Sequence, residues 1–193
     1  MRQQNNTVVD YNDEFYRLRL ATLAAVDDLI DAMFERLEAL DLLDNTYIIY
    51  TSDNGFHIGQ HRLDPGKGCA IEEDINIPMY IRGPGVPKGE TITFPTSHTD
   101  VVPTLFKLAG LPLLKTFDGL PMPVVEEDFS QAKTEHINVE FWGQTLGEGA
   151  YRTPYPLPNN TYKALRIVAD EYDLAYMVWC TNEHELYDMK VCH

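Results

Sequence analysis

The chain has 193 residues, of which 44% are apolar and 11% aromatic, so it is long enough and apolar enough to bury a core. Its formal net charge of −15 argues against a nucleic acid as partner, because phosphate backbones are bound by basic surfaces. No apolar run approaches the roughly 20 residues of a membrane-spanning helix, which argues against membrane insertion.

The first predicted element is a long amphipathic helix over residues 13–40. Apolar residues recur there at helical spacing, and acidic residues fall mainly on the outer face. Asn12 or Asp13 is expected to cap its start. We expect the apolar face of this helix to pack on a large part of the fold, and we assign the helix no chemistry.

An apolar strand over residues 47–50 follows the helix after a short turn. This order is typical of the second half of a βαβ unit and predicts a parallel sheet. A second strand is predicted over residues 77–81, before a turn rich in Gly and Pro. A second helix is predicted over residues 100–109, with Pro103 in its first turn and Gly110 as its C-terminal stop.

The C-terminal part has a different pattern. Residues 112–160 are rich in Pro and Gly, and hold one predicted strand at 137–141. Two strand-like runs, 162–169 and 172–179, predict a hairpin, and residues 185–189 predict a third short strand. The predicted fold class is therefore α/β, with a mostly parallel sheet flanked by helices in residues 1–150. The start of a small antiparallel sheet is expected in residues 151–193.

Asp53 and Asn54 come directly after the first predicted strand, where open α/β sheets bind their ligands. The sequence Asp-Asn-Gly is by itself a turn signature. At the end of a strand, however, a carboxylate and an amide oxygen are ligands that Ca²⁺ and Mg²⁺ prefer. Two ligands do not complete a site, so the others must come from elsewhere in the fold.

The same loop contains two histidines and a lysine. For His57 and His61 we expect no cysteine or third histidine nearby, so proton transfer or contact with an oxyanion is favoured over zinc binding. Lys67 lies between Gly66 and Gly68, where its ammonium could meet an anion, although a loop lysine is ordinarily a solvated charge. Cys69, Cys180 and Cys192 lack C-x-x-C spacing. The last two could form a disulfide or stay reduced.

Several motifs in a fixed order resemble the sulfatase family of the alkaline-phosphatase-like superfamily. In chain order they are residues 44–46, 51–57, Lys67, 77–85, 100–105, 109–110, 118–120, 162–166 and 185–188. The resemblance implies a partial alkaline-phosphatase-like fold. It also implies a sulfuric ester hydrolase, arylsulfatase-like, that cleaves sulfate monoesters with a divalent cation.

At the matching positions the resemblance implies roles for single residues. Asp53 and Asn54 are expected to bind Ca²⁺, with Mg²⁺ as an alternative. Lys67 is expected to be catalytic and to contact the sulfate and the leaving-group oxygen, and His57 is expected to be a further substrate contact. Glu73, Arg82 and Asp100 match framework positions and are interpreted as structural.

The family's nucleophile does not occur in this sequence. It is a formylglycine made from Cys or Ser in C-x-(P/A)-x-R, and none of the three cysteines has that context. We therefore expect this chain to be the C-terminal part of a longer sulfatase, inactive alone, with the formylglycine upstream in the missing N-terminal part of the same fold. The alternatives are a non-catalytic remnant of the sulfatase fold, or a phosphate or phosphonate ester hydrolase of the same superfamily.

The expected substrate is a small sulfate ester or a sulfated sugar, with no nucleic acid as partner. Two N-x-Thr sequons, at Asn5 and Asn159, are compatible with a glycoprotein. The location that the resemblance implies is secreted or vacuolar/lysosomal.

Overall fold

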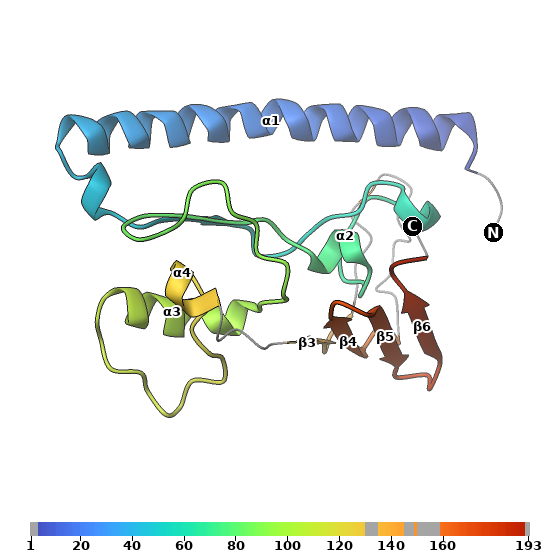
Figure 1. The fold of residues 1–193 in the computed structure, drawn as a ribbon. Helices are drawn as coiled ribbons and strands as arrows, with labels where there is room; N and C mark the ends of the chain where they lie inside the picture. Colours follow the sequence, from blue (N-terminus) through green and yellow to red (C-terminus); the bar gives the residue numbers. More distant parts are fainter. Residues whose placement is uncertain (1–3, 130–134, 145–148, 150–158, 192–193) are drawn as a thin grey trace. The chain divides into compact units, whose positions relative to one another are not determined.

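The computed structural model describes residues 4–129, 135–144, 149 and 159–191 (Figure 1). The chain forms two compact units, each considered by itself. Unit 1 comprises Met1–Pro84 and Phe141–Thr161, and unit 2 comprises Gly85–Glu140 and Tyr162–His193. The domain boundary predicted between residues 150 and 151 lies outside the described residues and stays a prediction.

Unit 1 begins with the long helix α1, Asn6–Ala39. The Asn5 side chain caps it by accepting a hydrogen bond from the Val8 backbone N–H at 3.0 Å. The helix was predicted, but the cap predicted at Asn12 or Asp13 is wrong, because Asn12 lies inside the helix and is buried. The first turns, residues 6–12, consist of Asn, Thr, Val, Asp and Tyr, which favour helices only weakly, so the sequence pattern places the start too late.

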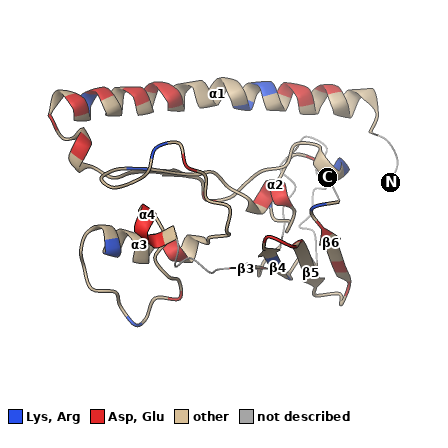
Figure 2. Cartoon of the chain, viewed as in Figure 1, with Lys and Arg blue, Asp and Glu red and all other residues tan. Residues whose placement is uncertain are grey.

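The apolar face of α1 is covered in two places within unit 1. Phe15 stacks on Phe56 with ring centroids 5.8 Å apart, and the Arg82 guanidinium lies 5.7 Å from the centre of the Phe34 ring. Leu29, by contrast, is 69% exposed. The predicted packing of the whole face is therefore found only in part within this unit. Acidic side chains outnumber basic ones along the helix (Figure 2).

Strands β1, Ile48–Thr51, and β2, Met79–Arg82, form a two-stranded sheet in unit 1. Both were predicted, but the expected parallel direction is wrong for this pair: Tyr50 lies opposite Tyr80 in an antiparallel register. A parallel pair usually needs a crossover helix. Here the connection contains only the 3-10 turn Gln60–Arg62 and the short helix α2, Glu72–Ile75, and the chain returns beside β1 in the opposite direction.

In unit 2 the 3-10 turn His98–Asp100 leads into α3, Val101–Leu108, which confirms the second predicted helix. Asp100 supports the start of this helix by accepting backbone hydrogen bonds from Ser97 and Leu120, each at 2.9 Å. Gly110 follows with a φ of 68°, a left-handed conformation that ends the helix. Asp100 thus makes the framework contacts expected of it.

The four-stranded sheet has the strand order β3-β4-β5-β6. Its strands are His136–Phe141, Tyr162–Val168, Asp173–Trp179 and His184–Asp188. β4 pairs antiparallel with β5, and β5 with β6, which confirms the predicted hairpin and third strand. Buried Tyr162, Ala164, Ala175 and Met177 alternate along β4 and β5, as expected when one face of a sheet forms a core.

Among the residues that the structure describes, no helix has both the length and the apolar composition needed to cross a lipid bilayer.

An ion pair joins α3 to the short helix α4, Glu126–Phe129, in unit 2: Lys107 Nζ lies 2.5 Å from Asp128 Oδ1. Burial alone would raise the pKa of Asp128, but the hydrogen bond and charge of Lys107 outweigh it and hold the pKa below its ordinary value of 3.8. Because the folded pKa is the lower one, the pair stabilises the protein above about pH 4. That stabilisation is lost as the pH falls through the lowered value.

We expect Lys107→Met to lower the melting temperature by about 1–3 °C near pH 7, since a partly exposed ion pair contributes less than about 1 kcal/mol. The difference from the parent protein should shrink as the pH falls below about 4, where Asp128 becomes protonated. Circular dichroism melts between pH 3 and pH 7 measure this. Lys115→Met, at an exposed lysine, is the control, and a Lys107→Met difference independent of pH would contradict the assignment.

Candidate active site

The loop between β1 and β2, residues 52–78, carries all four predicted site residues: Asp53, Asn54, His57 and Lys67. β1 ends at Thr51, so Asp53 and Asn54 lie just beyond the carboxyl end of a strand, as predicted.

Asp53 and Asn54 each keep one oxygen that can bind a ligand. Asp53 Oδ1 accepts the Asn54 backbone N–H at 2.9 Å, and Asn54 Nδ2 donates to the Gly55 carbonyl at 2.8 Å. Within the described part of the chain, neither Asp53 Oδ2 nor Asn54 Oδ1 has a hydrogen-bond partner. A carboxylate oxygen and an amide oxygen on adjacent residues fit part of the ligand set of a hard cation such as Ca²⁺.

Gly55 ties this pair of residues to helix α2. Its backbone N–H donates to the Asp74 carbonyl at 2.8 Å. A Cβ at position 55 would lie only 2.0 Å from the Glu73 carbonyl oxygen, so the close approach requires glycine. The turn signature Asp-Asn-Gly therefore has a packing reason here in addition to its ligand oxygens.

A pair of backbone hydrogen bonds closes the middle of the loop. His57 N donates to the Gly66 carbonyl, and Gly66 N donates to the His57 carbonyl, each at 3.0 Å. Lys67 is the next residue, so the bridge fixes its backbone beside His57. The Lys67 side chain is exposed, and no described residue forms a hydrogen bond or ion pair with its ammonium, which is free to meet an anion.

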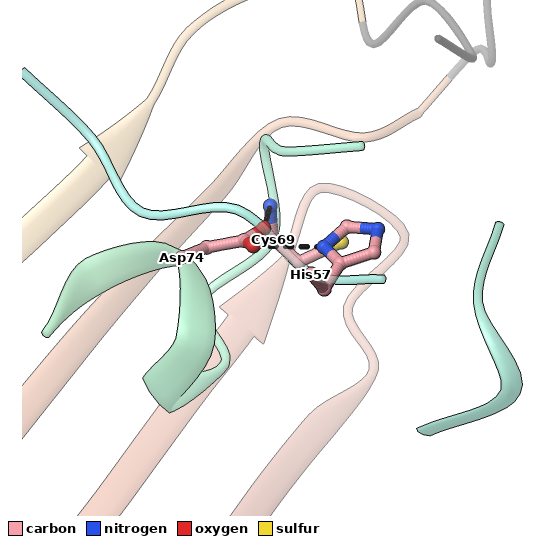
Figure 3. A group of neighbouring side chains, drawn as sticks. All are labelled: His57, Cys69 and Asp74. Atoms are coloured by element: carbon pink, nitrogen blue, oxygen red, sulfur yellow. Dashed lines mark hydrogen bonds and ion pairs between the residues drawn. The ribbon is translucent and has the colours of Figure 1, made fainter. Parts of the chain in front are cut away.

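The ring of His57 is held by a buried carboxylate. His57 Nδ1 lies 2.7 Å from Asp74 Oδ1, and both side chains are nearly inaccessible to solvent (Figure 3). An ionised carboxylate can only accept a hydrogen bond, so His57 Nδ1–H donates and Nε2 is the remaining ring nitrogen. The other oxygen of Asp74 accepts the Cys69 backbone N–H at 2.9 Å. Asp74 thereby orients His57 and holds the segment after Lys67.

His61 occupies a different environment. Its backbone is left-handed, with a φ of 52°, and its side chain is 55% exposed with Nε2 3.2 Å from Glu73 Oε2. The group of potential metal ligands found among the described residues contains His57, Cys69 and Asp74, and His61 is not part of it. Sequence reasoning missed Asp74, because nothing in the run Glu72-Glu73-Asp74 distinguishes the buried acid from its neighbours.

Replacing Asp74 by alanine should lower the free energy of unfolding by about 2–4 kcal/mol, because it leaves the His57 ring N–H and the Cys69 backbone N–H without their acceptor. Chemical denaturation followed by circular dichroism measures the loss. Asp64→Ala is the matched control, since the Asp64 carboxylate belongs to the same loop and makes no hydrogen bond among the described residues. Equal losses in the two variants would contradict the role of Asp74.

A family model described as Sulfatase matches residues 1–111 of this chain. The chain belongs to the sulfatase family. The match includes α1, both strands of the two-stranded sheet and the whole loop of Asp53, Asn54, His57 and Lys67.

Curated relatives of this sulfatase chain carry the same family name. The sulfatase ppz1 of Metarhizium majus is 53% identical over 95% of this chain, and the arylsulfatase of Volvox carteri is 38% identical over 98%. The extracellular sulfatase SULF-1 homolog of Drosophila melanogaster is 40% identical over 52% of this chain. The matched regions are 38%, 32% and 9% of the lengths of these relatives, so the chain spans well under half of each.

Solved structures show the fold of this sulfatase chain. BT4656, solved in complex with its substrate D-glucosamine-2-N,6-O-disulfate, superposes with a TM-score of 0.78 over 97% of this chain and 36% of its own, at 24% identity. The phosphonate monoester hydrolase SpPMH from Silicibacter pomeroyi gives a TM-score of 0.66 over 86% of this chain and 33% of its own, at 21% identity. These likenesses confirm the alkaline-phosphatase-like fold class.

Proposed function

We propose that the full-length protein is a sulfuric ester hydrolase that cleaves sulfate monoesters with a divalent cation. The supporting observation is that one loop carries two ligand oxygens, on Asp53 and Asn54, and one ammonium, on Lys67, none of which has a hydrogen-bond or ion-pair partner among the described residues. The backbone bonds of Gly55 to Asp74 and of His57 to Gly66 hold these groups on one frame.

The ammonium of this loop, together with a cation bound by its ligand oxygens, can stabilise the negative charge that develops when a sulfate ester is cleaved. Negative charge builds on the bridging oxygen and spreads over the other sulfate oxygens, and fixed positive charge stabilises it better than water does. A Ca²⁺ ion held by Asp53 and Asn54, with further ligands from outside this loop, would supply part of that charge. We assign the remaining part to Lys67, which contacts the sulfate and the leaving-group oxygen. Mg²⁺ is the alternative ion.

His57 is proposed as a further substrate contact. Its Nδ1–H is held by Asp74 and its backbone is bridged to Gly66, so the ring has a fixed orientation. Nε2 is the nitrogen left to meet a substrate oxygen. Because Asp74 fixes the ring before any substrate arrives, no side-chain ordering is needed at the moment of binding.

The nucleophile must come from elsewhere. No cysteine in this sequence has the context C-x-(P/A)-x-R. We propose that a formylglycine is supplied by a part of the full-length protein that this chain does not include. The chain alone is then expected to be inactive.

The proposed substrate is a small sulfate ester or a sulfated sugar. BT4656 acts on a sulfated sugar, and several relatives are named arylsulfatases or extracellular sulfatases. We propose on the same basis that the protein is secreted or vacuolar/lysosomal. Asn159 of the second sequon is exposed, which is compatible with a glycosylated surface.

The full-length protein should be assayed with aryl sulfate, phosphate and phosphonate monoesters that share one leaving group, while mass spectrometry searches for formylglycine. A kcat/KM highest on the sulfate, with formylglycine present, is the expected result. Preference for the phosphonate or phosphate would favour the alternative that the likeness to SpPMH suggests. Absence of both formylglycine and turnover would identify a non-catalytic remnant.

A further inference from the structure

Three side chains of different chemistry meet beside the proposed active-site loop. A ring nitrogen of His57, the sulfur of Cys69 and a carboxylate oxygen of Asp74 all lie within 4.8 Å of one another (Figure 3). The side chains of His57 and Asp74 are only 6% and 2% exposed, and Cys69 is half-buried. We propose that His57, Cys69 and Asp74 form a zinc-binding site, distinct from the oxygen pair at Asp53 and Asn54.

The ligand types select the metal. Imidazole nitrogen, thiolate sulfur and carboxylate oxygen are the three usual protein ligands of Zn²⁺. A thiolate is a soft ligand that disfavours Ca²⁺ and Mg²⁺, whereas Asp53 and Asn54 offer hard oxygens only. The loop thus holds two donor sets, one suited to a hard cation and the other to zinc.

The geometry is close to what zinc needs. Bonds of about 2.0–2.3 Å in a tetrahedral site place neighbouring ligand atoms about 3.3–3.7 Å apart. A pair at the 4.8 Å limit has to close by about 1.1–1.5 Å, whereas His57 Nδ1 and Asp74 Oδ1, which lie 2.7 Å apart, have to separate by about 0.6–1.0 Å where both bind the ion. Rotation of the side chains can supply changes of this size. Three protein ligands leave a fourth position for water or another small ligand.

Charge also balances at this site. Zinc binding requires the thiolate form of Cys69, so the thiol proton is released to solvent as the Zn–S bond forms. Where Nδ1 is the ligand atom of His57, the proton that Nδ1 donates to Asp74 moves to Nε2, so the imidazole stays neutral. One thiolate and one carboxylate then neutralise the two positive charges of the ion, which makes a largely buried position acceptable. Because protons compete with the metal for these ligands, zinc affinity should fall as the pH is lowered.

The ligand positions are anchored before any metal binds. His57 is bridged through its backbone to Gly66, and the Cys69 backbone N–H is bonded to Asp74. Such fixed positions reduce the ordering cost of binding. The spacing of residues 57, 69 and 74 matches no zinc motif, and Cys69 comes near His57 only because the loop folds back at Gly66.

The test is zinc and cobalt binding to the full-length protein, with Cys69→Ser and the matched control Cys180→Ser. We expect the parent and Cys180→Ser to bind Zn²⁺ through this site, and Co²⁺ to give a thiolate-to-metal charge-transfer band in both. Cys69→Ser should lose that band and bind zinc at least about 100-fold more weakly, since even indirect partners of a metal commonly contribute 10- to 100-fold. Excess Ca²⁺ should not displace the zinc.

A second measurement needs no variant. Zinc should slow the alkylation of Cys69 by iodoacetamide in the parent protein, read by peptide mass spectrometry, and leave exposed Cys180 unaffected. Equal zinc affinity of the parent and Cys69→Ser, a band that depends on Cys180, or alkylation of Cys69 unchanged by zinc would each overturn the proposal. These readouts do not depend on sulfate hydrolysis, so they separate this inference from the proposed function.

Discussion

Replacing Lys67 by alanine in the full-length protein is expected to lower kcat/KM for an aryl sulfate by about 100- to 1,000-fold. The Lys67 ammonium is exposed and makes no hydrogen bond or ion pair with any described residue, so it is available to stabilise charge on the leaving oxygen. For the same reason the variant should keep the melting temperature of the parent protein. Steady-state kinetics and thermal unfolding, measured on the same samples, check the two halves of this expectation.

The matched control for this experiment is Lys88→Ala. Lys88 is likewise exposed and without an ion pair among the described residues, but it lies outside the loop that carries the proposed site. Its removal lowers the positive charge of the protein equally, so any general electrostatic effect appears in both variants. Near-normal turnover of Lys67→Ala, or equal losses of kcat/KM in both variants, would show that Lys67 is not a catalytic residue.

Asp53→Asn should raise the Ca²⁺ concentration needed for half-maximal activity on the order of 100-fold, because calcium affinity depends strongly on ligand charge. The substitution keeps an oxygen that can accept the Asn54 backbone N–H, so the turn should survive. The measurement is the activity of EDTA-treated enzyme as Ca²⁺ is added back. A parallel titration with Mg²⁺ decides between the two candidate ions.

Asp27→Asn provides the control for Asp53→Asn, since it removes one acidic charge from the exposed surface of α1. It should leave the Ca²⁺ titration unchanged. If Asp53→Asn also titrates like the parent enzyme, the ligand oxygens do not come from Asp53, and the cation site must lie elsewhere.

Local sequence patterns predicted most helices and strands of this fold. Features that depend on contacts between residues far apart in the sequence were not predicted. The two strand-like runs over residues 162–169 and 172–179 predicted the β4–β5 hairpin, because a hairpin needs only neighbouring strands and a turn. The direction of β1 against β2 is set by the path of a long loop, which periodicity does not record. The start of α1 was missed because the turns that follow the Asn5 cap consist of residues with weak helix propensity, such as Asn, Thr, Val and Asp.

The residues of the candidate site likewise fall into those that the sequence predicted and those that only the structure revealed. Asp53, Asn54 and Lys67 are visible in the sequence as oxygen ligands and a glycine-flanked cation beyond a strand. Asp74 and Cys69 become partners of His57 only through the folded loop, and no spacing rule connects them. The sequence therefore predicted the residues proposed to contact a ligand, but not the residues that hold those side chains in position.

The backbone bridge between His57 and Gly66 has a consequence for variation in the loop. It closes the chain into a small ring whose two ends are joined by hydrogen bonds, so the outer residues 58–63 are not needed to hold Lys67 in register with His57. A segment attached in this way can change in length or composition at little entropic cost. Related proteins with longer or shorter outer segments could therefore adapt to different substrates around an unchanged cation, lysine and histidine.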